Sequence, residues 1–173
     1  TQNALLYDIG CVAKPGTAIS NDANAPSEEY KKQLEEKMAT VKLGINGFGR
    51  IGRVTFKNLI RRDDIEVVAI NDLTDSQTLA HLLKYDSIHG RFPFEVIAET
   101  NAISAKGVRV PVFAEKDPTL LPWNQLQVDV VLECTGRFTD STSASMHLTA
   151  GAKKVILSAP AKDAMKTVVL GVN

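Results

Sequence analysis

The sequence predicts an α/β domain built on a doubly wound, mostly parallel β-sheet, and three observations support this prediction. From Val41 onward, short apolar segments alternate with segments of helical periodicity, as in βαβ units. Residues 65–72, IEVVAIND, form a solid apolar run typical of a strand buried on both faces. Four glycines fall within residues 44–53, GINGFGRIGR, between the first predicted strand and the first predicted helix.

Length and composition exclude several classes of protein. The 173 residues suit one domain with a modest extension, and 44% apolar with 23% charged residues is an ordinary soluble composition. Twenty basic residues balance 20 acidic ones, which argues against a nucleic-acid-binding protein. No apolar run approaches the roughly 20 residues of a membrane span, and the N-terminus resembles neither a secretory signal nor a transit peptide. We therefore expect no nucleic-acid partner and no membrane contact.

The chain is expected to divide into an extension, residues 1–40, and a domain, residues 41–173. Residues 14–29, KPGTAISNDANAPSEE, are rich in Ala, Ser, Asn and Pro and show no strand periodicity. Residues 26–38 are predicted to form a short helix, because Pro and Ser suit its start and two glutamates follow them. Its narrow apolar stripe, typical of a surface or docking helix, consists of Tyr30, Leu34 and Met38.

The elements of the domain follow in chain order. Strands are predicted over residues 41–46, 65–72, 128–136, 153–160 and 167–173. Helices are predicted over residues 50–62, 74–86 and 142–152, the second of them with Thr74 or Asp75 as its N-cap. Residues 94–99 and 108–115 are predicted to be two antiparallel strands separated by residues 100–107, which makes a small antiparallel insertion in the sheet.

The glycine-rich segment predicts a dinucleotide site. Gly47, Gly49 and Gly52 form the pattern G-x-G-x-x-G, in which the first glycine permits a tight turn, the second lets the backbone approach a pyrophosphate, and the third allows close packing of helix on strand. Asp72 follows Gly52 by 20 residues, at the end of the next strand, where a carboxylate binds ribose hydroxyls. This carboxylate repels a 2′-phosphate, so NAD is favoured over NADP. The alternative is a glycine-rich structural turn.

Seven segments together resemble phosphorylating glyceraldehyde-3-phosphate dehydrogenase, and the resemblance runs from about Val41 to Asn173. They are GINGFGRIGR, VVAIND, LAHLLKYDSIHGRF, LPW, ECTG, GAKKVILSAPAKD and GVN. The resemblance implies a Rossmann-type domain of a cytoplasmic, homotetrameric glycolytic enzyme, with an organelle as the alternative compartment. It also implies oxidation of D-glyceraldehyde 3-phosphate by NAD and phosphate to 1,3-bisphosphoglycerate. A related enzyme, erythrose-4-phosphate dehydrogenase, usually has Glu at the position of Asp72 and a turn like SHP rather than SAP, so both features favour the glyceraldehyde enzyme.

Carried over by position, the resemblance implies a set of cofactor-binding residues. Arg50 and Ile51 are expected at the pyrophosphate, Asp72 at the ribose, and Lys116 near the adenine, where relatives often have Arg. The nicotinamide side is expected to be lined by Thr135, Gly136 and Phe138, with Ser158 nearby. The segments ECTG and ILSAP both end predicted strands, and ligands bind at the carboxyl edge of such sheets.

The sequence departs from the family in two respects. It ends at GVN, whereas the family's catalytic Cys lies beyond that point in a Ser-Cys-Thr-Thr-Asn motif, followed later by the general-base His. Neither motif occurs here, so we expect no catalytic residue within these 173 residues and no turnover by this chain alone. Residues 1–40 have no known counterpart in the family. The alternative function is a non-catalytic Rossmann module that binds NAD or a partner.

Other residues that could carry chemistry have simpler structural interpretations. The two cysteines, Cys11 and Cys134, have no metal-ligand spacing, so no metal site is expected, and Cys134 is expected to pack in the interior. His81 and His147 are expected to be helix residues without a catalytic partner, and His89 to hold its loop. The remaining interpretations place Trp123 as an anchor in the core, Arg50 near phosphate, Arg53 in a pair within the protein and Arg61–Arg62 at a solvated helix end.

Overall fold

The computed structural model describes residues 40–169 and 171–172, and all of them belong to one compact unit that spans Met38–Asn173. The helix predicted over residues 26–38, its apolar stripe, and Cys11 lie outside the described residues. The account below therefore concerns the described part of the domain.

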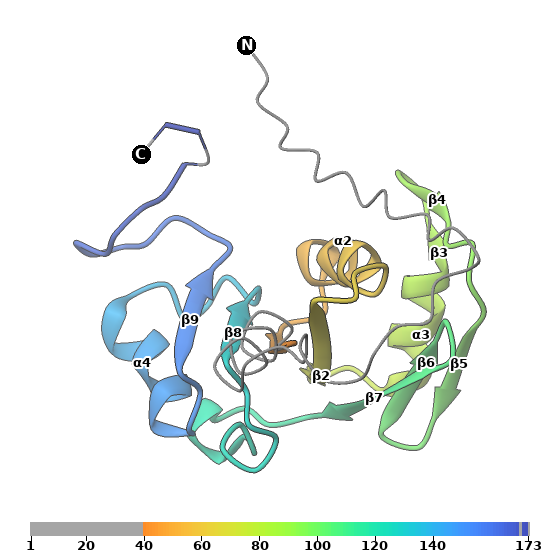
Figure 1. The fold of residues 1–173 in the computed structure, drawn as a ribbon, viewed down its shortest axis with the longest axis horizontal. Helices are drawn as coiled ribbons and strands as arrows, with labels where there is room; N and C mark the ends of the chain where they lie inside the picture. Colours follow the sequence, from red (N-terminus) through yellow and green to blue (C-terminus); the bar gives the residue numbers. More distant parts are fainter. Residues whose placement is uncertain (1–39, 170, 173) are drawn as a thin grey trace, which may run out of the picture. The chain divides into compact units, whose positions relative to one another are not determined.

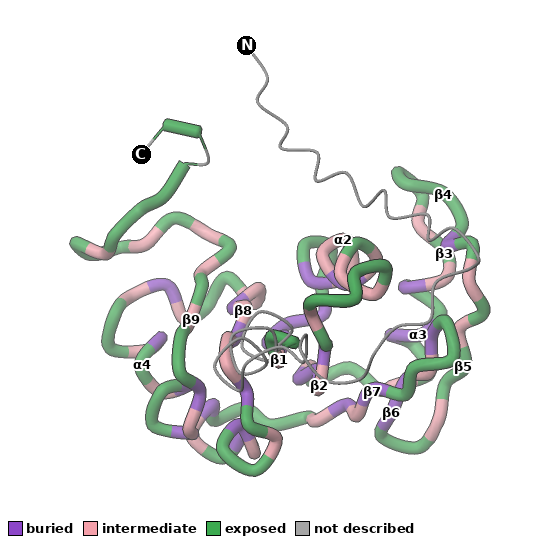
Figure 2. The backbone as a smooth tube through the Cα atoms, viewed as in Figure 1, coloured by how far each residue is buried: buried purple, intermediate pink, exposed green. Residues whose placement is uncertain are grey.

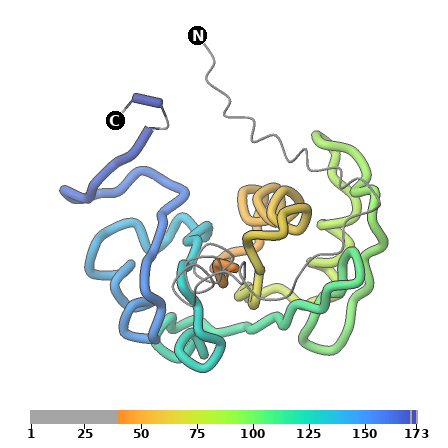
Figure 3. The backbone as a smooth tube through the Cα atoms, viewed as in Figure 1, coloured from red at the N-terminus to blue at the C-terminus, as the bar shows by residue number. Residues whose placement is uncertain are grey.

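Seven strands form one sheet in the order β5-β6-β7-β2-β1-β8-β9. Their bounds are β1 (Val41–Asn46), β2 (Ile65–Asn71), β5 (Val96–Glu99), β6 (Ala102–Ala105), β7 (Val108–Phe113), β8 (Val130–Glu133) and β9 (Lys154–Leu157). From β7 to β9 every neighbouring pair is parallel, while β5 and β6 add antiparallel strands at the edge beyond β7. Figure 3 shows that the chain enters the sheet in its middle with β1, in orange, builds toward the green strands, and then crosses to the blue ones. The predicted fold class is confirmed.

Two predictions about strands are wrong. Residues 102–105, predicted as part of a connection, form β6, because Ala102, Ile103 and Ala105 are buried and this segment pairs with strands on both sides. Residues 167–173 were expected to form a strand, but residues 167–169 and 171–172 have no strand structure. Val168 and Val169 are 62% and 53% exposed, so the apolar pattern that predicts a strand there is not buried in this structure.

Within residues 40–169, three α-helices accompany the sheet: α2 (Arg50–Leu59), α3 (Ser76–Lys84) and α4 (Ser141–Thr149) (Figure 1). Asp75 is the N-cap of α3, and its side chain accepts a hydrogen bond from the N–H of Thr78, as one of the two predicted caps requires. The predicted helix ends earlier than expected, at Lys84, because the chain then forms a short hairpin of β3 (Tyr85–Asp86) and β4 (Gly90–Arg91). A short 3₁₀ helix, Pro118–Leu120, was not predicted.

The helices cover both faces of the sheet. Phe56 of α2 and Leu83 of α3 share a hydrophobic cluster with Ile70 of β2, whereas Ala69, the preceding residue of the same strand, belongs to a second cluster with Trp123. Successive residues of a strand point to opposite faces, so the two clusters lie on opposite sides of the sheet. Figure 2 shows buried stretches along β2 and α3, while the segment after β9 is mostly exposed. Trp123 is fully buried, which confirms its predicted role as a core anchor.

Candidate functional site

The parallel strands of the sheet end together at one edge, and polar residues occupy this edge. The backbone N–H of Gly47, just after β1, donates to the carbonyl of Asn71 at the end of β2 (2.8 Å). The N–H of Cys134, just after β8, donates to the carbonyl of Asn46 at the end of β1 (2.7 Å). The chain order reverses between β1 and β8, and in open α/β sheets the crevice at such a reversal is where ligands bind.

The glycine-rich turn has the geometry that its three glycines predict. Gly47 has φ +89°, and a Cβ on it would lie 2.7 Å from the backbone nitrogen of Thr135. Gly52 is buried within α2, where a Cβ would lie 2.3 Å from the carbonyl oxygen of Gly47. Gly49 differs from both, because no heavy atom lies within 4 Å of the position that its Cβ would take. Two of the glycines therefore permit close packing, and Gly49 faces open space.

The N-terminus of α2 begins at this open space. Its N-cap is Gly49, which offers no side-chain acceptor to the first N–H groups of the helix. No acidic residue lies in the first turn either, so the positive end of the helix dipole is not neutralised by its own side chains. Backbone N–H groups and a helix dipole of this kind form a site for an anion such as a phosphate.

Asp72 is held in place by the glycine-rich turn. One of its carboxylate oxygens, Oδ2, accepts the backbone N–H of Phe48 (2.7 Å), and the other, Oδ1, accepts the N–H of Thr74 (2.9 Å). Its own N–H donates to the carbonyl of Phe113 at the end of β7 (2.9 Å). These contacts fix the carboxylate beside the glycine turn and leave its second lone pairs for a ligand.

A pocket of about 560 Å³ lies at this edge of the sheet, a size typical of small-molecule and cofactor sites. Six of the residues predicted to bind the cofactor line it together: Gly47, Gly49, Asp72, Lys116, Thr135 and Phe138. They come from the glycine turn, the end of β2, the segment after β7 and the segment after β8. The fold therefore brings together residues that lie far apart in the sequence.

The other five predicted residues are not part of the pocket lining. Arg50 and Ile51 are exposed at the start of α2, next to Gly49, and Gly52 is buried beneath the turn. Gly136 adopts φ +69° in the turn after β8. Ser158 follows β9, where its N–H donates to the carbonyl of Glu133 (2.9 Å). Arg50 and Gly136 adjoin lining residues in the sequence, Ile51 and Gly52 belong to the first turn of α2, and Ser158 lies at the same sheet edge.

The pocket also includes residues that sequence reasoning missed, namely Asn46, Asn71, Leu73, Thr74, Glu115, Cys134 and Arg137. Asn46 and Asn71 could have been found, because each is a polar residue at or next to the end of a predicted strand, at the carboxyl edge where ligands of such sheets bind. Glu115 and Arg137 have no such signal, since charged residues are common in surface loops. Cys134 is half-buried, and burial raises the pKa of its thiol, which makes it a poor nucleophile.

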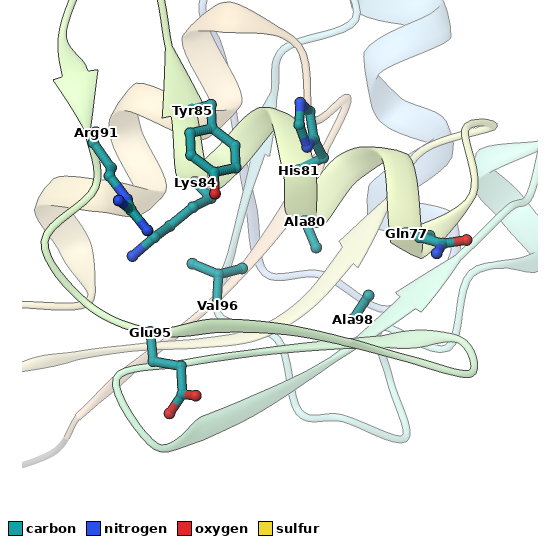
Figure 4. A pocket seen from close by; sticks show the side chains of 9 residues that line it. All are labelled: Gln77, Ala80, His81, Lys84, Tyr85, Arg91, Glu95, Val96 and Ala98. Carbon is teal, nitrogen blue, oxygen red and sulfur yellow. The ribbon is translucent and has the colours of Figure 1, made fainter.

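A second pocket, of about 540 Å³, lies between α3, β5 and the β3–β4 hairpin (Figure 4). Its cationic side chains are engaged by the protein: Lys84 Nζ donates to the carbonyls of Phe92 and Phe94, and the Arg91 guanidinium lies 5.4 Å from the centre of the Tyr85 ring. None of the predicted site residues lines it. The pocket at the sheet edge is therefore the candidate functional site.

Two further findings concern other kinds of site. Among residues 40–169 and 171–172, no three His, Cys, Asp or Glu side chains gather in a way that could hold a metal ion. Within the same residues, every helix is too short or too polar to cross a membrane.

Comparison with known proteins agrees with the geometry. Residues 41–141 match the sequence model of the glyceraldehyde 3-phosphate dehydrogenase NAD-binding domain. Glyceraldehyde-3-phosphate dehydrogenase of Geobacillus stearothermophilus is 58% identical over 133 residues, which cover 77% of this chain and 40% of that protein. A Streptomyces avermitilis enzyme of the same name is 59% identical over 135 residues, and one from Thermotoga maritima is 55% identical over 134.

This chain spans about 40% of the length of the curated relatives that it matches. The match to the family's sequence model covers more than half of the chain. The cofactor of the matched domain is NAD, as the glycine-rich turn and Asp72 predict. The chain therefore belongs to the family of the glyceraldehyde 3-phosphate dehydrogenase NAD-binding domain, a family of NAD-dependent oxidoreductases.

Proposed function

We propose that this chain is the NAD-binding part of a phosphorylating glyceraldehyde-3-phosphate dehydrogenase. The whole enzyme would oxidise D-glyceraldehyde 3-phosphate with NAD and phosphate to 1,3-bisphosphoglycerate, as a homotetramer in the cytoplasm. The relatives, which carry the name glyceraldehyde-3-phosphate dehydrogenase, support this proposal. The domain itself would comprise residues 41–173, after an extension of residues 1–40.

The observation that carries the proposal is the open space over Gly49, bounded by the N-terminus of α2 and by Asp72. In our proposal the diphosphate of NAD lies over Gly49, with Arg50 and Ile51 beside it. Its oxygens accept hydrogen bonds from the first N–H groups of α2. The free lone pairs of the Asp72 carboxylate accept the ribose hydroxyls.

From the diphosphate, the two ends of the cofactor would extend along the pocket in opposite directions. The adenine would lie toward Lys116, and the nicotinamide toward Thr135, Gly136 and Phe138, with Ser158 nearby. Gly47 and Gly52 would act by letting strand, turn and helix approach one another, without contact through a side chain.

Calorimetry with the 173-residue chain tests the proposal. NAD should bind and release or absorb heat, and NADP should bind at least roughly tenfold more weakly, because its 2′-phosphate meets the Asp72 carboxylate. The substitution Gly49→Ala should weaken NAD binding while it leaves the unfolding midpoint nearly unchanged, since the added methyl meets only the space of the diphosphate. If the chain gives no heat with NAD, or if Gly49→Ala binds NAD normally, the proposed site is wrong.

We further propose that the 173 residues alone do not turn over substrate, because the Ser-Cys-Thr-Thr-Asn motif of the family is absent from them. Covalent aldehyde oxidation needs a nucleophile and a base to activate it. Purified chain mixed with glyceraldehyde 3-phosphate, phosphate and NAD should therefore produce no NADH, as followed by its near-ultraviolet absorbance. Steady NADH formation at a rate proportional to the concentration of this chain would contradict the proposal. If the chain binds NAD, but a longer protein that contains it does not oxidise the substrate either, the chain would instead be a non-catalytic NAD-binding module.

A further inference from the structure

A network of hydrogen bonds between buried polar side chains runs behind the pocket wall. It begins at Trp123. The indole Nε1–H of Trp123 donates to Nδ1 of His147 in α4 (3.0 Å). The neutral imidazole must then carry its proton on Nε2, which lies 3.1 Å from Oε2 of Glu133 and donates to it. His147 is fully buried and Glu133, at the end of β8, is only 2% exposed. His147 lies in a helix, as predicted, and its side chain also hydrogen-bonds to Trp123 and Glu133.

Glu133 passes these contacts on to residues of the pocket wall. Its Oε1 accepts the backbone N–H of Thr135 (2.7 Å) and also the Thr135 hydroxyl. That hydroxyl in turn accepts the N–H of Arg137 (3.1 Å), so the turn after β8 is built around it. The other carboxylate oxygen, Oε2, accepts the side-chain amide of Asn46 (2.5 Å). Thr135, Arg137 and Asn46 line the pocket, whereas Glu133 and His147 are not among its lining residues.

The network continues from Asn46 to the other side of the pocket. The side-chain oxygen of Asn46 accepts Nδ2 of Asn71 (2.7 Å). Asn71 then bonds to both backbone groups of Glu115, whose N–H donates to Oδ1 and whose carbonyl accepts from Nδ2 (both 2.9 Å). The hydrogen bonds therefore cross β8, β1 and β2 and end at Glu115, a further lining residue. One continuous set of side chains holds both walls.

The ring of His147 also contacts the pocket wall directly. Phe138, which lines the pocket, packs edge-on against it, with ring centres 6.2 Å apart. His147 therefore supports the segment after β8 at two points, at Thr135 through Glu133 and at Phe138 through its ring. His147 itself does not line the pocket, so it acts on the pocket only through Glu133 and Phe138.

A buried carboxylate keeps such a geometry only while its donors are present. Burial by itself raises the pKa of Glu133, but the hydrogen bonds from His147, Thr135 and Asn46 together outweigh it and hold the pKa of this carboxyl below its ordinary value. Glu133 is thus ionised in the interior, where an unpaired charge would be strongly destabilising. Loss of one donor forces the carboxylate to shift toward others, and Thr135 and Asn46 must shift with it.

We propose that His147 is a positioning residue for the NAD pocket, which acts by donating its Nε2–H to Glu133 and so holds Thr135 and Asn46 in place at the pocket wall. This proposal rests on the proposed NAD-binding function. It assigns a role in cofactor affinity to a residue that never touches the cofactor.

Two substitutions of His147 separate this role from general packing. His147→Asn keeps an acceptor near the Nδ1 position for Trp123 but removes the donor to Glu133, whereas His147→Gln places an amide N–H near the Nε2 position. We expect His147→Asn to weaken NAD binding roughly tenfold, as the loss of a hydrogen bond to a charged group predicts. His147→Gln should restore the affinity to within about twofold of the unsubstituted chain. Calorimetry on the full 173-residue chain gives both values.

A second measurement needs no NAD. In the NAD-free chain, the amide of Thr135 should exchange with solvent faster in His147→Asn than in the unsubstituted chain or in His147→Gln, because the acceptor of that amide has moved. If the unsubstituted chain binds no NAD, the proposed function fails, yet this exchange rate still tests the positioning role. Equal NAD affinity and equal Thr135 exchange in His147→Asn and the unsubstituted chain would overturn the proposal. Equal losses in both variants, with Thr135 exchange unchanged, would reduce His147 to a packing residue.

A measurement on the unsubstituted chain covers the case in which His147→Asn does not fold. Nitrogen-detected NMR of the imidazole should show the proton of His147 on Nε2, with Nδ1 accepting from Trp123. A proton on Nδ1 would leave Glu133 without this donor and would overturn the proposal by itself.

Discussion

At the scale of single residues, the three glycines of the turn have different physical requirements, although they belong to one sequence pattern. We predict that Gly52→Ala lowers the free energy of unfolding by about 1–3 kcal/mol, because its Cβ would lie 2.3 Å from a backbone oxygen that cannot move independently. Gly49→Ala is the matched control, with an expected change below about 1 kcal/mol. Urea unfolding followed by the fluorescence of Trp123, the single tryptophan, measures both. Equal midpoints for the two variants would contradict the packing role of Gly52.

At the scale of elements, Asp75 shows how one side chain starts a helix. Its carboxylate accepts both the N–H and the hydroxyl of Thr78, and these hydrogen bonds lower the pKa of Asp75. We predict that Asp75→Ala destabilises the protein by about 1 kcal/mol, whereas Asp75→Asn, which can still cap α3, changes stability by less than half of that amount. The midpoint of urea unfolding at neutral pH tests this. A larger loss for Asn than for Ala would exclude capping as the explanation.

Asp86 links the β3–β4 turn to α2, because its carboxylate accepts hydrogen bonds from that turn and from Lys57 of α2. The N–H groups of His89 and Ile88 and the Lys57 ammonium (3.1 Å) hold the pKa of Asp86 well below its ordinary value. The His89 side chain also lies beside this carboxylate, with Nδ1 3.3 Å from Oδ2, a position that fits the prediction that this residue holds its loop.

The lowered pKa of Asp86 predicts how the stability of the protein depends on pH. Because the folded-state pKa lies below the unfolded one, the contribution of the carboxylate is complete above the unfolded value of about 4 and disappears as the pH falls through the folded value. The stability difference between the natural chain and Asp86→Asn should therefore be constant near neutral pH and shrink as the pH falls below about 4. Urea midpoints of both proteins across this range provide the measurement. A difference that does not depend on pH would show that the charge of Asp86 contributes nothing.

At the scale of the whole molecule, the two hydrophobic clusters of the described residues consist of side chains between Leu43 and Val155. We predict that a chain beginning at Met38 folds and binds NAD as the full chain does, with a free energy of unfolding within about 0.5 kcal/mol. Thermal or urea unfolding and calorimetry of the two chains compare them directly. A markedly less stable shorter chain would indicate instead that residues 1–37 contribute to the stability of the domain, for example through Tyr30 and Leu34 of the predicted apolar stripe.

Much of the fold could be predicted from the sequence, since β1, β2, the glycine turn and the N-cap of α3 all follow from local patterns. Strand β6 could not, because a segment of four residues has no periodicity of its own and becomes a strand only between two partners. The valines at 168 and 169 make the opposite case, because their apolar pattern is typical of a strand but no sheet neighbour buries them here. Burial depends on the rest of the molecule and is not a property of a short segment.

The sequence by itself determined the α/β class, the place of the glycine turn and the identity of the coenzyme, because the backbone geometry of glycine and the charge of one carboxylate are local properties. Only the tertiary structure decided which residues meet at the sheet edge. Asn46, Glu133 and His147 are separated by up to 101 positions, yet they share one buried network. A polar side chain reveals its partners only after the sheet has aligned the ends of its strands, because a buried charge must find its donors in space and not along the chain.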